Sequence, residues 1–270
     1  MKKKPPIAHW SHSSLTAFLR NPLAWYKRYV EGVQDMPASP SSFVGRAAHV
    51  CLEHFYNGIP KEKAMLLGLH YLRDVQDVEI NFGTAKTKKA KKRKRAQMEH
   101  GYTQAVSFYL ERPPRHKVLG VEIRAMAEVP GLTLPVKAVS DLVVRSRVDP
   151  NAVDIIDHKF VDSFSKYGAQ KTLFVIQAIF NYYTVRDMFQ KPVRRFMVYE
   201  CKKTKNTDGS SQMRRYIINF DDCKEEFVLF HRLINDATEE ITRQRKYLPN
   251  PSDMFEGENS FDIYRLGLVD

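Results

Sequence analysis

Long hydrophobic runs are missing from this chain, and cysteine is scarce. No apolar stretch approaches the ~18 residues that a membrane-spanning helix needs, and polar residues follow Met1–Pro6 where a signal peptide would have an apolar core. The three cysteines, Cys51, Cys201 and Cys223, form no C-x-x-C pair, so they predict neither a disulfide framework nor a zinc site. We therefore expect an intracellular, cytoplasmic protein with reduced thiols and no membrane partner.

A G-x-x-x-x-G-K-[ST] loop for ATP phosphates is also absent, so any motor that works with this protein must be a separate chain. No repeat and no clear linker divides the sequence. The 270 residues, 43% hydrophobic and 11% aromatic, suffice for one sizeable core. We expect a single domain, with a mostly helical part over 1–112, a sheet-containing core over 113–250 and a tail over 251–270.

Acidic residues are outnumbered, with 31 Asp and Glu against 43 Lys and Arg, which leaves a net charge of +12. Such a charge attracts polyanions, nucleic acid above all. The densest basic segment, Lys86–Arg95, contains no acid, and its mutual repulsion predicts a mobile loop or a solvated extension of a helix. We favour nucleic-acid contact over an inert solubilising run. The candidate contacts are Lys88, Lys89, Lys91, Lys92, Arg93, Lys94 and Arg95.

Apolar periodicity and turn residues predict the order of helices and strands. That order favours an α/β protein with a mixed central sheet flanked by helices and a helical N-terminal half, rather than a doubly wound parallel sheet. The expected helices begin near Ser11, are interrupted at Asn21-Pro22, and continue over Phe43–Tyr56, Lys61–Val78, Ala96–Leu110, Lys171–Met188 and Asp221–Lys246. The expected strands cover Lys117–Ala127, Leu134–Arg145, Val153–Val161, Val193–Lys202 and Met213–Phe220.

Two of these apolar strands each contain an acid, Asp141 in one and Asp157 in the next. A carboxylate without a partner in a buried strand costs several kcal/mol, and a divalent cation is a natural partner for two of them. Residues i and i+2 share a face of a strand, so Lys159 would lie beside Asp157. An ammonium beside a metal-bound water suits phosphodiester hydrolysis. A buried Asp157–Lys159 ion pair without metal is the alternative.

Further motifs follow one another along the chain. They are Ser11-x-Ser13-x-Leu15-x-x-Phe18 with Pro22, Gly45-Arg46-Ala47-Ala48-His49-x-x-x-Glu53, Val121-Glu122, Asp157-His158-Lys159 and Gln177. With Asp141, this series resembles the PD-(D/E)XK nuclease superfamily, in its RecB-type exonuclease branch. The resemblance runs from residue 11 to about residue 182 and implies a single nuclease domain with a restriction-endonuclease-like core.

The resemblance also implies a metal site. Asp141, Asp157 and the backbone carbonyl of His158 would bind Mg²⁺ or Mn²⁺, and His49 would bind the metal or orient a ligand or water. Without the motif, His49 would more often be a buried structural histidine. The side chain of His158 would point away from Lys159 on a strand, so we assign it no chemistry.

Three further roles are implied by the same resemblance. Lys159 would position the attacking water and stabilise charge on the phosphoryl oxygens. Glu122 would be an acid beyond the direct ligands, and Gln177 would hold the lysine or a phosphate. The tyrosine that the family places four residues after the glutamine is Asn181 here, and Tyr182 lies a further ~100° around the helix. A tyrosine contact to substrate is therefore not expected.

Iron-sulfur members of this branch carry four cysteine ligands, one of them just before the N-terminal proline. This chain has Asn21 at that position and three cysteines in all, so we expect no iron-sulfur cluster.

The resemblance implies a metal-dependent deoxyribonuclease, an exonuclease in recombination, repair or phage DNA processing, in the cytoplasm of a bacterial or phage-infected cell. DNA would be its partner, with a helicase, recombinase or single-strand-binding protein. One alternative is a catalytically inactive nucleic-acid-binding module with a nuclease-like fold, and another is a metal-free structural protein. The intact set of Asp141, Asp157 and Lys159 argues against the inactive module.

Overall fold

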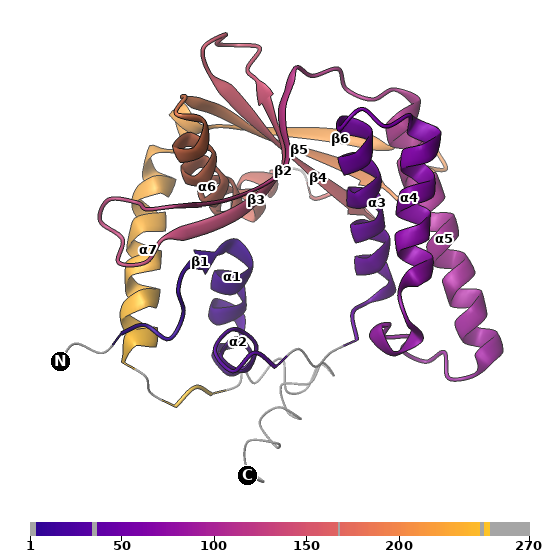
Figure 1. The fold of residues 1–270 in the computed structure, drawn as a ribbon, viewed down its shortest axis with the longest axis horizontal. Coiled ribbons are helices and arrows are strands. Elements are labelled where there is room, and N and C mark those ends of the chain that lie inside the picture. Colours follow the sequence, from indigo (N-terminus) through magenta and orange to yellow (C-terminus); the bar gives the residue numbers. More distant parts are fainter. Residues whose placement is uncertain (1–3, 34–36, 167, 244–245, 249–270) are drawn as a thin grey trace.

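The computed structural model describes residues 4–33, 37–166, 168–243 and 246–248. Within them, one six-stranded mixed sheet is flanked by helices (Figure 1). The elements are β1 (Trp10–Ser11), α1 (His12–Arg20), α2 (Pro22–Tyr29), α3 (Pro40–Tyr56), α4 (Lys61–Asp74), the 3-10 helix η1 (Asp77–Glu79), α5 (Lys88–Glu111), β2 (Val118–Ala127), β3 (Val136–Arg145), β4 (Val153–Val161), α6 (Gln170–Phe189), β5 (Val193–Lys202), β6 (Met213–Asn219), the 3-10 helix η2 (Phe220–Asp222) and α7 (Lys224–Thr242). The predicted α/β class, with its mixed sheet and helical N-terminal half, is confirmed.

Strand β3 is the branching point of the sheet. Along one edge it pairs antiparallel with β2, and along the other it pairs antiparallel with β4 and, at Val136 and Lys137, parallel with β1. Strand β4 then pairs parallel with β5, which pairs antiparallel with β6. A parallel pair needs a crossover connection, and α6 provides it between β4 and β5.

The sheet separates two hydrophobic cores. One, which we call the α6-side core, takes residues from α1, α2, α6 and α7, and the other, the α3-side core, takes residues from α3, α4 and α5. Figure 1 shows the same division, with α3, α4 and α5 together on one side of the molecule. Side chains alternate along β4, since Ile155 lies in the first core and Ile156 in the second.

Several expected helix boundaries differ in the structure, and for two of them the cause is visible. Helix α4 ends at Asp74 rather than Val78, because Arg95 forms an ion pair with Asp77 and donates to the carbonyl of Val75, which holds this segment against α5. Helix α7 begins at Lys224 rather than at residue 221, because residues 220–222 form the 3-10 helix η2.

The basic run forms the first turns of α5, a helix of 24 residues capped by the hydroxyl of Thr87. The solvated helix extension is therefore the form that the segment takes. Among the described residues, every helix is too short or too polar to cross a lipid bilayer. The predicted tail over 251–270 lies outside the described residues.

Candidate active site

The site lies where β3 and β4 stop pairing. Their ladder runs from Arg145 opposite Val153 to Leu142 opposite Ile156 and ends there. The residues that come next on the two strands, just past the end of the ladder, are Asp141 and Asp157. Beyond this point β1 pairs with the edge of β3 that β4 leaves. We call this place the fork.

Strand β3 and its other neighbour, β2, are both irregular beside the fork. The Ser140 hydroxyl donates to α6, and Val143, three residues on, belongs to the α6-side core, so regular alternation is broken between them, at Asp141. Opposite Asp141, Glu122 has φ +49°. A left-handed conformation at a residue other than glycine costs about 1–3 kcal/mol and is typical of functional sites.

These irregularities bring Asp141 and Glu122 to His49 of α3. The ligand atoms of the three side chains all lie within 4.8 Å of one another. The His49 Nδ1 atom is 3.5 Å from Asp141 Oδ1 and 3.8 Å from Glu122 Oε1. Ligands at 2.0–2.6 Å from a common cation lie at most about 5 Å apart, so the group fits a divalent ion. Glu122, expected beyond the direct ligands, thus lies within ligand distance of the other two.

A protonated His49 supplies the positive charge of this group when no metal is bound. Burial alone would lower the pKa of His49, but Asp141, Glu122 and Asp157 together raise it to about 10. Burial would raise the pKa of Asp141, yet His49 and the buried His158 hold it well below its usual range. The backbone N–H of His158, just past the end of the ladder, donates to Asp141 Oδ2 at 2.6 Å.

Asp157 has different partners. Lys159 Nζ lies 2.8 Å from Asp157 Oδ2 and donates to Oδ1 at 3.1 Å, which confirms that the two residues share a face. Gln177 of α6 donates to the same Oδ1 at 2.7 Å, so it holds the carboxylate rather than the lysine. The buried Oδ2 accepts no hydrogen bond within the described part of the chain. The cationic neighbour of Oδ2 is the Lys159 ammonium at 2.8 Å, and joint ligation of a metal by Asp141 and Asp157 stays a prediction.

The pKa values of both members of this pair are raised. Burial would lower the pKa of Lys159, but the adjacent Asp157 carboxylate raises it, so the ammonium stays protonated. Burial and the charge of Asp141 raise the pKa of Asp157, while Lys159 opposes that change.

Asn181, which replaces the family's tyrosine, ties α6 to β3. Its amide nitrogen donates to the carbonyl of Gln177, and its oxygen accepts from Ser140 at 2.6 Å. Tyr182 instead packs against Phe220 and Phe227, within the aromatic layer between α6 and α7. The expectation that no tyrosine at this position reaches the site agrees with this packing.

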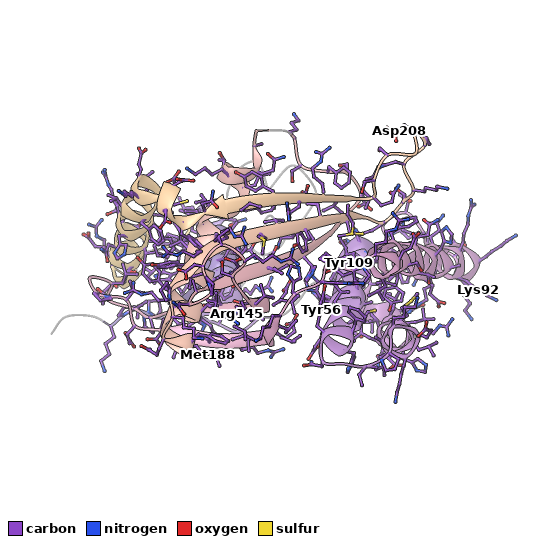
Figure 2. The ribbon with its side chains drawn as sticks, turned by 90° about the horizontal axis from the view of Figure 1, so that it is seen from above. Tyr56, Lys92, Tyr109, Arg145, Met188 and Asp208 are labelled. Atoms are coloured by element: carbon purple, nitrogen blue, oxygen red, sulfur yellow. The ribbon has the colours of Figure 1, made fainter. Side chains whose placement is uncertain are left out.

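The side-chain contacts of two histidines near the site were not predicted. The ring of His158 is 1% exposed, accepts or donates at Nε2 with the Tyr109 hydroxyl at 2.8 Å, and has Nδ1 3.5 Å from Asp141 Oδ2. It points away from Lys159, as expected, but the irregularity at Asp141 brings the carboxylate to it. The hydroxyl of Tyr109 also forms a hydrogen bond with the hydroxyl of Tyr56. Figure 2 shows these two tyrosines side by side, where α3 and α5 approach each other. The alternation of a regular strand gives no signal for this contact.

The second of these histidines is His12, the first residue of α1. Its ring meets the edge of Phe180 at 6.5 Å between centroids. Burial first, and then the charge of Lys159, lower the pKa of His12 to about 4. A neutral imidazole therefore lies within the electrostatic reach of Lys159. In the sequence its only signal is its place between Ser11 and Ser13.

The basic run is not part of the fork. Lys92 lies about 25 Å along α5 from Tyr109 at 1.5 Å per residue, and Figure 2 shows Lys92 at the far end of the helix. Lys91 lies over the ring of Phe82 at 5.3 Å, and Arg95 is paired with Asp77. Of the seven candidate contacts, five have no such partner within the described part of the chain: Lys88, Lys89, Lys92, Arg93 and Lys94.

A sheet that forks at two acids, with a lysine beside one and a cluster of possible ligands around the other, is the arrangement of a phosphodiester-hydrolysing nuclease of the restriction-endonuclease type. The family model of the PD-(D/E)XK nuclease superfamily matches residues 9–254, and the chain belongs to this superfamily. No curated protein matches the chain. A solved structure titled "Crystal structure of SSO0001" is similar at 14% identity over 94% of this chain and 91% of that one, with a TM-score of 0.34.

Proposed function

We propose that this protein is a Mg²⁺- or Mn²⁺-dependent deoxyribonuclease of the RecB-type branch that degrades DNA from its ends. Membership of the superfamily supports a metal-dependent nuclease. The observation that carries the proposal is the fork, where His49, Glu122 and Asp141 come within ligand distance beside the Asp157–Lys159 pair. A fold stabilised by packing alone has no need for a left-handed glutamate or for several largely buried acids in one place.

A divalent cation at the fork would acidify its water and offset negative charge on the phosphoryl group. His49, Glu122 and Asp141 would hold it, and Asp157, which is paired with Lys159, would be a further ligand. Lys159 orients the nucleophilic water and stabilises developing charge on oxygen. Gln177 fixes Asp157, and thereby the direction from which Lys159 approaches.

DNA is the proposed partner because of the net charge of +12 and the exposed cations at the start of α5. We place the activity in recombination, repair or phage DNA processing, in the cytoplasm of a bacterial or phage-infected cell. A helicase, recombinase or single-strand-binding protein would supply the DNA ends.

The test uses linear and circular DNA, single- and double-stranded, and an RNA of matched length, each with Mg²⁺, Mn²⁺ or EDTA. Wild type should degrade linear DNA with either metal and spare circles, and Lys159→Ala should not degrade it. Degradation of circles would contradict the exonuclease, and preference for RNA would contradict the substrate. DNA binding without degradation would favour an inactive nucleic-acid-binding module, and neither binding nor degradation would favour a structural protein.

A further inference from the structure

A hollow of about 410 Å³ opens beside the fork, between the first turns of α3 and the end of β4. Its edge toward the fork is formed by His49 and Lys159, so it is continuous with the candidate metal site. The roles already assigned to residues at the fork do not use its opposite wall. That wall contains Ser41, Ser42, Gly45, Arg46 and Lys203.

Lys203 gives this wall a buried positive charge. Its side chain is 7% exposed, and Nζ donates to the hydroxyl of Ser41. The acid nearest to it, Asp162, lies 3.5 Å away with a side chain that is 74% exposed, and it also accepts from Ser41 at 3.1 Å. An exposed carboxylate at this distance is a weak counter-ion because water screens it. An anion in the hollow would give Lys203 a stronger counter-ion than Asp162.

Arg46 adds a second cation to the same wall. It is exposed and its guanidinium lies over the ring of Phe43 at 5.1 Å, which leaves its N–H edge available. Guanidinium groups bind phosphate oxygens in pairs, and lysine binds them as a point charge. Lys203, Arg46 and the hydroxyls of Ser41 and Ser42 therefore form a set of donors suited to a tetrahedral oxyanion.

Gly45 indicates that space in front of α3 is kept free. A glycine inside a helix costs about 0.5–1 kcal/mol relative to alanine, and here a side chain would have met nothing within 4 Å. No packing or positive φ explains the glycine, yet it lines the hollow one turn before His49.

The N-terminus of α3 itself contributes little to the site. The side chain of Ser39 already accepts from the N–H of Ser42, and Pro40 has no N–H. The two cationic side chains, not the helix end, therefore define the ligand.

We propose that this hollow binds a phosphate of the nucleic-acid strand that neighbours the phosphate at the fork, with Lys203 and Arg46 as its charged contacts. The inference rests on the proposed function and adds a substrate-positioning subsite to it. A phosphate oxygen takes the place of Asp162 beside Lys203, and the strand runs from the hollow past His49 and Lys159. The phosphate is either a terminal monoester or an internal diester, and the experiment distinguishes them.

The experiment measures binding by fluorescence anisotropy in EDTA, where no cleavage occurs, over a series of salt concentrations. The probes are a single-stranded oligonucleotide with a 5′-phosphate, the same with a 5′-hydroxyl, one with a 3′-phosphate, and a circle. Lys203→Gln and Arg46→Gln should each weaken binding about tenfold and reduce the slope of log affinity against log salt by about one phosphate. Loss on one phosphorylated end alone identifies a terminal phosphate, and equal loss on all probes identifies an internal one.

Lys191→Gln is the matched control. Lys191 is exposed in the turn before β5, and its substitution removes the same charge as Lys203→Gln does. It should change binding less than twofold. Lys203 is buried, so a second variant separates loss of charge from loss of packing. Lys203→Arg keeps the positive charge and should bind as wild type does. Gly45→Leu provides a second route, since leucine strengthens the helix and fills the hollow, so its thermal midpoint should rise while binding weakens.

Wild-type affinity and an unchanged salt slope in Lys203→Gln, Arg46→Gln and Gly45→Leu would overturn the subsite. If those variants bind normally while wild type degrades DNA with metal, only the subsite fails. If wild type neither binds nor degrades nucleic acid, the proposed function itself fails.

Discussion

The two acids at the fork differ in what neutralises them. Asp157 is paired with Lys159, an amine that stays protonated, and is fixed by Gln177 from the α6 side of the sheet. Asp141 is paired with His49, an imidazole on the α3 side, together with Glu122. The proton on His49 can leave when a metal arrives, whereas the charge on Lys159 remains. Under the proposed function, one half of the fork would exchange a proton for a metal, and the other would keep a fixed positive charge beside the reaction.

The largest effect is expected from Lys159→Ala. Loss of the ammonium that stabilises charge on the phosphoryl oxygens should lower the cleavage rate about 10²–10³-fold. Single-turnover cleavage with Mg²⁺ measures it, and Lys191→Ala should cleave as wild type does. Cleavage by Lys159→Ala within about threefold of wild type would contradict the role given to the fixed charge.

Neutralising the two acids one at a time tests the difference between the two halves of the fork by their effects on stability. Asp157→Asn leaves the partly exposed Lys159 without its partner, but it also removes a carboxylate whose burial raises its own pKa, so the unfolding free energy in EDTA should fall by about 1 kcal/mol or less. Asp141→Asn removes the carboxylate that, against the effect of burial, chiefly raises the pKa of His49 and that accepts from the His158 N–H, so it should cost about 2–3 kcal/mol. Urea unfolding measures both, and equal losses would remove the difference between the two halves.

The stability of the metal-free protein should depend on pH through His49. The pKa of His49 is raised to about 10 in the folded chain, against about 6.5 in the unfolded chain. This stabilisation is complete below pH 6.5 and is lost as pH rises toward 10. Urea unfolding in EDTA between pH 6 and pH 10 should show this loss in wild type and not in His49→Gln. Added Mg²⁺ should stabilise wild type more at pH 9 than at pH 6, because the metal then competes with fewer protons.

The smallest effect is expected far from the fork. Lys92 lies about 25 Å along α5 from Tyr109, so Lys92→Gln should weaken binding of long duplexes only, and only two- to threefold in about 0.1 M salt. Anisotropy with a 30-base-pair and a 5-base-pair duplex tests this. An equal loss on both duplexes would mean that the basic run approaches the fork.

Much of this arrangement follows from local rules. The period of two in Ile155–Val161 predicts that Asp157 and Lys159 share a face, and they do. Turn residues and apolar runs also predict the segments of strands β2 to β6 and of helix α6, but they miss the short strand β1. These features depend on neighbours in sequence, so sequence patterns are sufficient for them.

The rest depends on exceptions to local rules. The contact of His49 with Glu122 needs a left-handed residue in β2, and that of Asp141 with His158 needs a break in the alternation of β3. Neither is visible in composition or periodicity, because each is imposed by pairing across strands. The approach of Lys203 to Ser41, 162 positions apart in sequence, is equally a result of tertiary packing.

Metal binding tests the central claim most directly. Titration calorimetry with Mn²⁺ at pH 8 should find a site in wild type that Asp141→Asn removes or weakens at least tenfold, while Asp74→Asn, an exposed acid at the end of α4, binds Mn²⁺ as wild type does. Absence of a Mn²⁺ site in wild type, or an unchanged site in Asp141→Asn, would contradict the account.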